Sequence, residues 1–511
     1  LLSVMVFNVL RDWILLHITA RVNIALISDY LIKLMNLPVT FFGNKLMGDI
    51  LQRAQDHERI RSFIMNNSLS LIFSMLTFVV FAIILLIYNV VIFLIFLAGS
   101  ALYVGWVLLF LNVRKKLDWE YFELLSRNQS YWVETVSAIQ DVKINNYEKQ
   151  RRWKWKEIQA RLYHVNKRVL AITNMQNLGA QFIESIKNMG IVFFCAVAVI
   201  NGDITFGVMI STQFIIGMLN GPLSQFISFV MGAQYAKISF LRINEIRQLE
   251  DEEELLPVGN TCILPNEKSI TLSNVHFQYS ANSPFVLKGI YLHIPENKVT
   301  AIVGGSGCGK STLLKLLVRL YKPSFGDIKM DTMNVDAINL HQWRNLCGVV
   351  MQDGKVFSDT IINNIVLDAD RIDYDRLHEV CKIAQLEEEI NAMPNGFDTT
   401  VGETGRGLSG GQKQRLLIAR ALYRNPKMLF LDEATNALDT INERKIVDAL
   451  NNAFEHRTVV VIAHRLSTIQ NADQIVVLDK GYIVEVGTHK TLMENKKRYY
   501  ELVSSQTQTL P

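Results

Sequence analysis

Long runs of uncharged, mostly apolar residues fill the first half of the chain. Residues 62–113 contain no Asp, Glu, Lys or Arg, and residues 204–236 contain none either. Because a membrane span needs about 20 apolar residues, the first run predicts two spans and the second predicts one. The spans pair into helical hairpins that turn near Asn89 and Asn201. We expect spans at about 1–18, 66–88, 90–112, 172–200 and 205–235.

A charged segment, residues 114–168, separates the two hairpins. It holds thirteen Lys and Arg against seven Asp and Glu. The positive-inside rule places this segment and the C-terminal half in the cytoplasm. Its helical apolar spacing predicts that the adjoining spans continue there as helices. Leu1 would then start outside, and because it is not Met and opens in apolar sequence, we expect a fragment that lacks at least one preceding span.

The second half is typical of an α/β domain. After the acidic stretch RQLEDEEELLP, apolar β-rich runs alternate with helical patterns. Four runs, VTAIVG, KMLFLDE, TVVVIAH and DQIVVLD, predict buried parallel strands. The expected organisation is a partial transmembrane domain at 1–242, a linker at 243–267, an α/β domain at 268–505 and a tail at 506–511.

Composition adds exclusions to this picture. The net charge of +4 is small for 511 residues and does not indicate a nucleic-acid partner. The five cysteines are scattered without a CxxC pair. They therefore argue against a disulfide framework and against a zinc site.

A glycine-rich stretch, GGSGCGKST, follows the first of these strands and opens a helical pattern. It fits G-x-x-x-x-G-K-[ST], whose backbone N–H groups surround phosphate oxygens. Lys310 would reach the β- and γ-phosphates, and the Ser311 hydroxyl would bind Mg²⁺. The candidate nucleotide-binding residues here are Gly304, Gly305, Ser306, Gly307, Cys308, Gly309, Lys310, Ser311 and Thr312.

Acidic and polar residues end three other apolar runs. In MLFLDEAT, Asp432 fits a residue that holds Mg²⁺ and Glu433 sits where it could polarise an attacking water. Taken alone, His464 is better explained as a structural hydrogen-bonding residue, and Gln352 carries no signal. A second glycine-rich stretch, GLSGGQKQ, also opens a helix and could hold an anion on its N–H groups.

The order of GGSGCGKST, MQD, LSGGQ, FLDEAT, ALD and AHR resembles the nucleotide-binding domain of an ABC transporter over residues 268–505. The resemblance implies that Tyr279 stacks on adenine and that Gln352 senses Mg²⁺ and the γ-phosphate. It makes Glu433 the catalytic carboxylate, His464 the γ-phosphate switch and Asp439 a residue that communicates across the dimer. Cys308, where Ser is commoner, and Asn436, often Ser, remove no catalytic group.

The same resemblance gives the second glycine-rich stretch a different role. One chain has one Lys-bearing loop and one signature sequence. The signature is then half of a shared site, which holds the γ-phosphate of ATP bound to the other chain. Its residues are Leu408, Ser409, Gly410, Gly411 and Gln412.

The membrane half resembles the exporter branch of this family. NLPVTFFGNKLMGDILQRAQD is similar to the first intracellular loop of exporters for peptides, bacteriocins and type I secretion substrates. VETVSAIQDVKINNYE resembles the second intracellular loop, which docks into the partner's ATPase domain. Many such exporters carry an N-terminal cysteine-peptidase domain, which here would lie upstream of Leu1.

The sequence therefore predicts an α-helical transmembrane domain of exporter type followed by an α/β P-loop ATPase domain. The expected function is ATP-driven peptide export, of bacteriocin-like or leader-bearing cargo, by a homodimer that binds ATP and Mg²⁺. It would lie in a bacterial inner membrane with its ATPase domain in the cytoplasm. The alternatives are a lipid or drug exporter, and a membrane-anchored mechanical ATPase or gated channel.

Overall fold

The computed structural model of the protein describes residues 2–44, 47–253, 263–367, 372–402, 405, 407–434, 449–450, 452–463 and 469–507. The chain separates into two compact units, Leu1–Glu252 and Glu253–Pro511.

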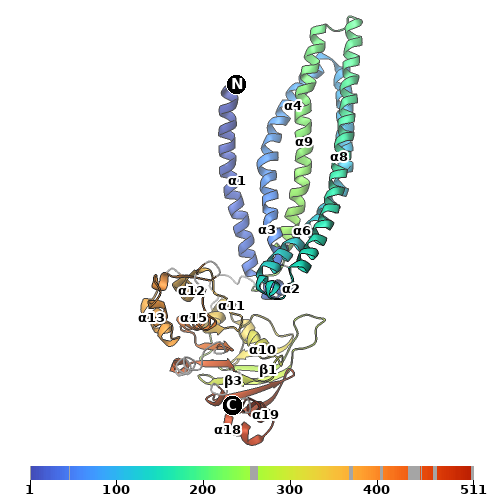
Figure 1. Ribbon diagram of the computed structural model, residues 1–511. Helices are drawn as coiled ribbons and strands as arrows, with labels where there is room; N and C mark the ends of the chain where they lie inside the picture. Colours follow the sequence, from blue (N-terminus) through green and yellow to red (C-terminus); the bar gives the residue numbers. More distant parts are fainter. Residues whose placement is uncertain are drawn as a thin grey trace. The chain divides into compact units, whose positions relative to one another are not determined.

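The first unit is built from helices, several of them very long (Figure 1). Helices α5 and α6 join at Phe110, whose backbone is itself helical, and form one continuous helix. Its first part is apolar and its second part is charged. Helix α8 likewise runs without a break from its charged start to its apolar end. The helices are α1 (Leu2–Asn36), α2 (Val39–Asn44), α3 (Met47–Ser62), a π-helix (Phe63–Ser68), α4 (Leu69–Tyr88), α5 (Val90–Leu109), α6 (Leu111–Ser137), α7 (Ile139–Ile144), α8 (Glu148–Ile200) and α9 (Phe206–Arg247).

Polar residues break the apolar runs into hairpins. The Asn89 side chain accepts hydrogen bonds from the N–H groups of Val91 and Ile92 and so caps the start of α5. Thr205 caps α9 in the same way, after a turn in which Gly202 has a φ of +80°. Helix α1 continues beyond residue 18 to Asn36, and α9 continues beyond residue 242 to Arg247.

Several of these helices have the length and composition of membrane spans. Within the described residues, three pass both criteria, and Ser74–Tyr88 is a shorter apolar helix. The three are Val90–Ser137, Glu148–Ile200 and Phe206–Arg247.

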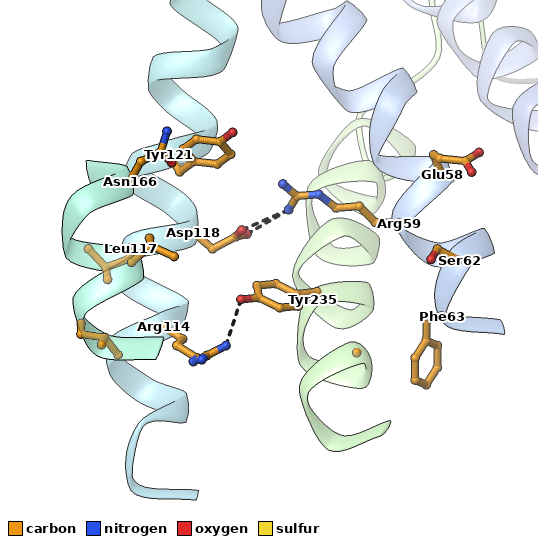
Figure 2. A pocket seen from close by; sticks show the side chains of 13 residues that line it. Glu58, Arg59, Ser62, Phe63, Arg114, Leu117, Asp118, Tyr121, Asn166 and Tyr235 are labelled. Atoms are coloured by element: carbon orange, nitrogen blue, oxygen red, sulfur yellow. Dashed lines mark hydrogen bonds and ion pairs between the residues drawn. The ribbon is translucent and has the colours of Figure 1, made fainter. Parts of the chain in front are cut away.

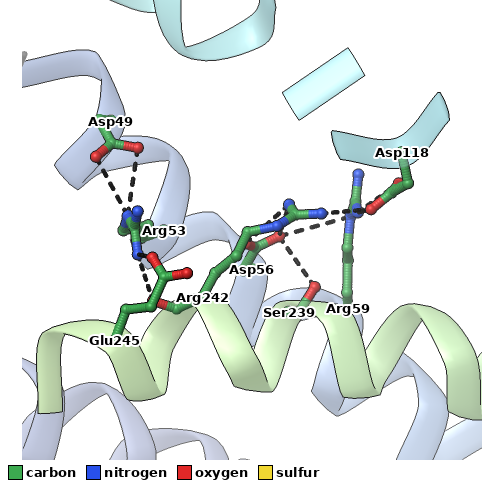
Figure 3. Close-up of polar contacts among 8 residues, drawn as sticks. All are labelled: Asp49, Arg53, Asp56, Arg59, Asp118, Ser239, Arg242 and Glu245. Carbon is green, nitrogen blue, oxygen red and sulfur yellow. Dashed lines mark hydrogen bonds and ion pairs between the residues drawn. The ribbon is translucent and has the colours of Figure 1, made fainter. Parts of the chain in front are cut away.

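A fully buried arginine ties three helices of this unit together (Figure 3). Arg242 of α9 is 0% exposed; its Nη1 lies 3.2 Å from Asp56 Oδ2 of α3, and its Nη2 pairs with Asp118 of α6. Ser239 donates a hydrogen bond to Asp56 at 3.0 Å. The guanidinium also lies 4.1 Å from the ring centre of Phe122. Burial of a cation is tolerated here because two carboxylates neutralise it.

The second unit combines α and β structure. Its strands are β1 (Ile270–Phe277), β2 (Leu287–Ile294), β3 (Val299–Val303), β4 (Phe325–Met330), β5 (Met333–Asn334), β6 (Cys347–Val350), β7 (Asp359–Thr360), β8 (Thr400–Val401), β9 (Met428–Asp432), β10 (Thr458–Ile462), β11 (Gln474–Asp479) and β12 (Tyr482–Gly487). Its helices are α10 (Lys310–Leu317), α11 (Leu340–Leu346), α12 (Ile361–Val366), α13 (Tyr374–Ile383), α14 (Glu387–Asn391), α15 (Gly410–Tyr423), α18 (His489–Asn495) and α19 (Arg498–Thr507).

The main sheet of the described residues has the order β12-β11-β3-β10-β9-β6. Strands β11, β3, β10, β9 and β6 pair in parallel, and only β12 is antiparallel to its neighbour. The four apolar runs predicted as buried parallel strands are confirmed as β3, β9, β10 and β11. A separate antiparallel sheet has the strand order β2-β1-β4-β5.

Both faces of the parallel strands β3, β9, β10 and β11 of the main sheet are buried, as is usual for parallel strands. Along β9, Leu429 and Leu431 join a core with helices α12, α13 and α15, whereas Met428 and Phe430 join a second core with α10 and the antiparallel sheet. This alternation follows from the two-residue period of a strand. In the parallel strands the charged groups therefore lie at the strand ends, where the loops begin.

In the first unit, replacing Arg242 tests whether the buried ion pairs hold the helices together. Arg242→Ala leaves the buried carboxylates of Asp56 and Asp118 with only the partly exposed Arg59 as a cation. We therefore expect a loss of about 3 kcal/mol in unfolding free energy, the low end for a broken buried ion pair. The measurement is thermal unfolding of the detergent-solubilised chain. Arg247→Ala, exposed on the same helix, is the matched control and should melt like the wild type. An unchanged melting temperature for Arg242→Ala would contradict the role.

Candidate functional site

The loop between β3 and α10 has the conformation of a phosphate cradle. Gly304, Gly307 and Gly309 have φ values of +155°, +75° and +109°, which favour glycine. A Cβ on Gly304 would come within 2.1 Å of the Leu478 carbonyl oxygen. The loop can therefore close tightly only because these positions lack side chains.

Lys310, the first residue of α10, lies folded over this loop. Its Nζ donates hydrogen bonds to the carbonyl oxygens of Gly304 at 2.9 Å and Gly305 at 3.0 Å. The side chain is 6% exposed. The ammonium group is thus held at the mouth of the loop, where an anion placed on the N–H groups would meet it. Cys308 is buried against the same loop, and burial raises the pKa of its thiol.

Asp432 ends β9 and faces the start of α10. It is 2% exposed, and burial raises the pKa of its carboxyl while a hydrogen bond with Ser311 lowers it. Its Oδ1 is buried without a hydrogen-bond partner. A buried oxygen of this kind needs a proton or a cation. A carboxylate and a hydroxyl beside a phosphate loop are ligands that Mg²⁺ takes together with substrate phosphates, so Ser311 and Asp432 fit that ion.

Glu433 meets Gln352 at the same edge of the sheet. The Gln352 Nε2 donates to Glu433 Oε2 at 3.0 Å. The two residues follow β9 and β6, which are neighbouring parallel strands, so their carboxyl ends lie side by side. Glu433 has a φ of +52°, a left-handed conformation that costs a non-glycine residue about 1–2 kcal/mol. Its N–H donates to the Ile462 carbonyl oxygen at 3.2 Å, which helps to hold that conformation.

Tyr279 lies beside the first turn of α10. Its hydroxyl is 2.9 Å from Thr312 Oγ1. Its ring packs edge-on against Phe277 and Tyr321, with ring centres 5.0 and 5.3 Å away. The residue is 41% exposed, so part of an aromatic surface stays open next to the phosphate loop.

The signature sequence forms the start of α15. Ser409 is the N-cap, with its Oγ accepting from the Gln412 N–H at 3.2 Å, and the Gln412 Oε1 accepts from the Ser409 N–H at 2.9 Å. This is a capping box. Helix geometry provides no acceptor for the first N–H groups, which here include those of Gly410 and Gly411. Leu408 precedes the cap and packs against the core.

Two contacts of α15 were missed by the sequence analysis. Gln414 Nε2 donates to the Glu433 carbonyl oxygen at 3.3 Å, and Gln412 Nε2 donates to Glu389 Oε2 at 3.0 Å. Two residues apart on a helix, these side chains face different directions. The spacing of Gln412 and Gln414 in the sequence therefore indicates that they contact different segments. It does not reveal which segment each one contacts.

The structure thus brings together the phosphate loop, Ser311, Thr312, Tyr279 and Asp432 around the start of α10. It brings Glu433 and Gln352 together after neighbouring strands. The hydroxyl oxygen and the N–H of Ser409 both bond to Gln412 of its own helix turn. Two further predicted site residues, His464 and Asp439, lie outside the described residues.

Comparison with known proteins follows the same division of the chain. A family model described as ABC transporter transmembrane region matches residues 1–223, and one described as ABC transporter matches residues 287–436. A bacterial Atm1-family ABC exporter, solved with ATP bound, superposes with a TM-score of 0.89 at 26% identity, covering 98% of this chain and 88% of that one.

Curated relatives are similar over almost the whole chain. The toxin RTX-I translocation ATP-binding protein of Actinobacillus pleuropneumoniae is 33% identical over 97% of this chain and 70% of its own length. The leukotoxin export ATP-binding protein LtxB of Aggregatibacter actinomycetemcomitans is 33% identical over 96% of this chain and 69% of its own. The predicted fold class is confirmed. The chain belongs to the ABC transporter family, as an exporter-type membrane protein whose cytoplasmic ATPase domain couples ATP hydrolysis to transport.

Proposed function

We propose that this ABC exporter moves polypeptide cargo, peptides or protein, across the membrane as a homodimer. The observation that carries the cargo class is similarity over 97% of the chain to a toxin translocation protein. Bacteriocin-like and leader-bearing peptides are one form of such cargo. Lipid or drug export remains the alternative within transport.

The roles of the site residues belong to the same proposal. Glu433 would polarise the attacking water, held in place by its left-handed backbone and by Gln352. Lys310 and the loop N–H groups would bind the phosphates, and Tyr279 would stack on the base. Mg²⁺, when bound, would neutralise phosphate charge and would be held by Ser311 and Asp432, with Gln352 close to the γ-phosphate. His464 would switch with the γ-phosphate.

We further propose that each ATP site is shared between two chains. The support is the exposed, capped start of α15 together with one loop and one signature per chain. The N–H groups of Gly410 and Gly411 and the Ser409 hydroxyl would contact the γ-phosphate bound to the partner chain. Asp439 would contribute to communication across this interface.

Glu433→Gln tests the catalytic role. The amide keeps the size of the side chain but cannot accept the proton, so hydrolysis should fall about 10²–10⁴-fold while ATP still binds. Phosphate release and equilibrium nucleotide binding are the measurements. Glu494→Gln, exposed on α18, is the control and should keep the wild-type rate. Unchanged turnover in Glu433→Gln would reject the assignment. If Glu433→Gln retains ATP but still moves cargo at the wild-type rate, a gated channel or mechanical ATPase would be favoured.

Mixed dimers test the shared site. Lys310→Ala damages the loop, whereas Ser409→Asp keeps a good N-cap residue but sets a negative charge against phosphate. Suppose that the sites are shared and that a chain with both substitutions pairs with a wild-type chain. One ATP site then has the damaged loop and the other has the damaged signature, so both sites fail. Lesions on separate chains leave one site intact.

The readout is ATP retained by differentially tagged, purified mixed dimers. We expect nucleotide retention only when the lesions are on separate chains. The reverse pattern, with retention only when both lesions share one chain, would show that each site is built within a chain. Ser409→Asn, a neutral N-cap, is the control for the charge.

Cargo class is tested by ATPase stimulation. The chain in phosphatidylcholine nanodiscs should hydrolyse ATP faster with an unfolded polypeptide, because cargo binding favours closure of the ATPase domains. Glu433→Gln is the background control. Stimulation by lipids or small amphiphiles, with none by polypeptides, would contradict peptide export and support the lipid or drug alternative.

A further inference from the structure

A cavity of about 680 Å³ lies within the first unit, between helices α3, α6, α8 and α9 (Figure 2). This volume falls in the range of small-molecule binding sites. Its walls combine apolar side chains with polar ones. The polar and charged lining includes Arg59, Arg114, Asp118, Tyr121, Asn166 and Tyr235.

The cavity lies where uncharged helix gives way to charged helix. Arg61 is the last charge before the uncharged residues 62–113, and Arg114 is the first charge after them. Ser62 and Arg114 both line the cavity. The two ends of the uncharged hairpin therefore meet at this point.

Most charges around the cavity are neutralised by each other. Arg59 Nη1 lies 3.1 Å from Asp118 Oδ1, and Asp118 also pairs with the buried Arg242. Glu58 pairs with Arg61 at 3.2 Å. Each of these charges is therefore neutralised by a neighbouring side chain and does not require a bound ion.

Arg114 differs from these residues. It is 8% exposed, and none of the ion pairs in the described part of the chain includes it. Its Nη2 donates to Thr173 Oγ1 at 3.1 Å. Its Nη1 donates to Tyr235 Oη at 3.4 Å (Figure 2). Its Nε is buried with no hydrogen-bond partner.

A buried guanidinium is costly unless an anion neutralises it. The Thr173 and Tyr235 hydroxyls orient Arg114 but carry no charge. Arg114 also presents a planar set of donors that suits a carboxylate or phosphate.

We propose that this cavity binds an anionic oxygen group, a carboxylate or a phosphate, on Arg114. The apolar part of the same ligand would lie against Phe63, Leu117, Val169 and Ile172, which complete the lining. The anion could come from a peptide carboxylate or from a lipid headgroup. The site goes beyond the proposed function, because it does not require the cargo to be a peptide.

Two probes distinguish the sources, both used on the full chain in nanodiscs. The first is a short neutral peptide with a C-terminal carboxylate, compared with its C-terminal amide in phosphatidylcholine nanodiscs. The second is retention of phosphatidylglycerol over phosphatidylcholine from mixed nanodiscs, measured by native mass spectrometry. A charge-assisted contact predicts a preference of about 10- to 100-fold for the anionic member of one pair.

Arg114→Gln should abolish that preference, and Arg114→Lys should retain part of it because the charge remains. Arg127→Gln, exposed on the same helix and paired with Glu123, is the control and should leave it unchanged. A second pair of variants keeps Arg114 intact. Val169→Glu supplies an internal carboxylate and should remove the preference, whereas Val169→Gln should preserve it.

The outcomes separate cleanly. A carboxylate preference lost in Arg114→Gln and Val169→Glu identifies a peptide anion, and Arg114-dependent phosphatidylglycerol retention identifies a lipid phosphate. Wild-type protein with neither preference, or preferences that survive both variants, overturns the site. Lipid retention without polypeptide-stimulated hydrolysis would leave the site standing while the peptide-export proposal fails.

Discussion

The ATPase site depends on one constraint, the common direction of the parallel strands in the main sheet. Both faces of these parallel strands are buried, so their charged groups lie only where the strands end. The carboxyl ends of β3, β9 and β6 lie on one edge. The phosphate loop therefore lies near Asp432, and Glu433 lies beside Gln352, although these segments are far apart in sequence. No side chain has to be selected for that proximity, because the backbone pairing produces it.

This constraint explains how much of the ATPase unit could be predicted. Apolar runs ending in polar residues were enough for the strands, the loop and the fold class, and the order of motifs was enough for the family. The detail of the site was not accessible. Gln352 has no signal until β6 is known to pair with β9, and the contact of Gln414 with Glu433 depends on which face of α15 meets the sheet edge. A single sequence shows that α15 is a helix but not how it is rotated against its neighbours.

In the membrane unit, too, the contacts between distant segments could not be predicted from the sequence. The charges of residues 114–168 predict that this segment leaves the lipid, but they do not show which charged side chains are buried. The structure buries Arg242 between Asp56 and Asp118 (Figure 3). It also buries Arg114 beside the hydroxyls of Thr173 and Tyr235. Charge patterning indicates which segments leave the lipid, but the pairing partners come from helices distant in sequence. Because an unpaired buried charge is costly, these pairings restrict which helices can pack against each other.

The signature helix shows how a structural role and a binding role can coexist in one residue. A hydroxyl can accept one hydrogen bond and still donate another. Ser409 uses its oxygen to cap Gln412, which leaves its hydrogen for an external acceptor. The capping box also orders the backbone of Gly410 and Gly411 before any ligand arrives, so little conformational entropy remains to be lost on binding. In a shared site, the missing step would then be the approach of the second chain, and the free energy of ATP contacts would be available to drive that closure.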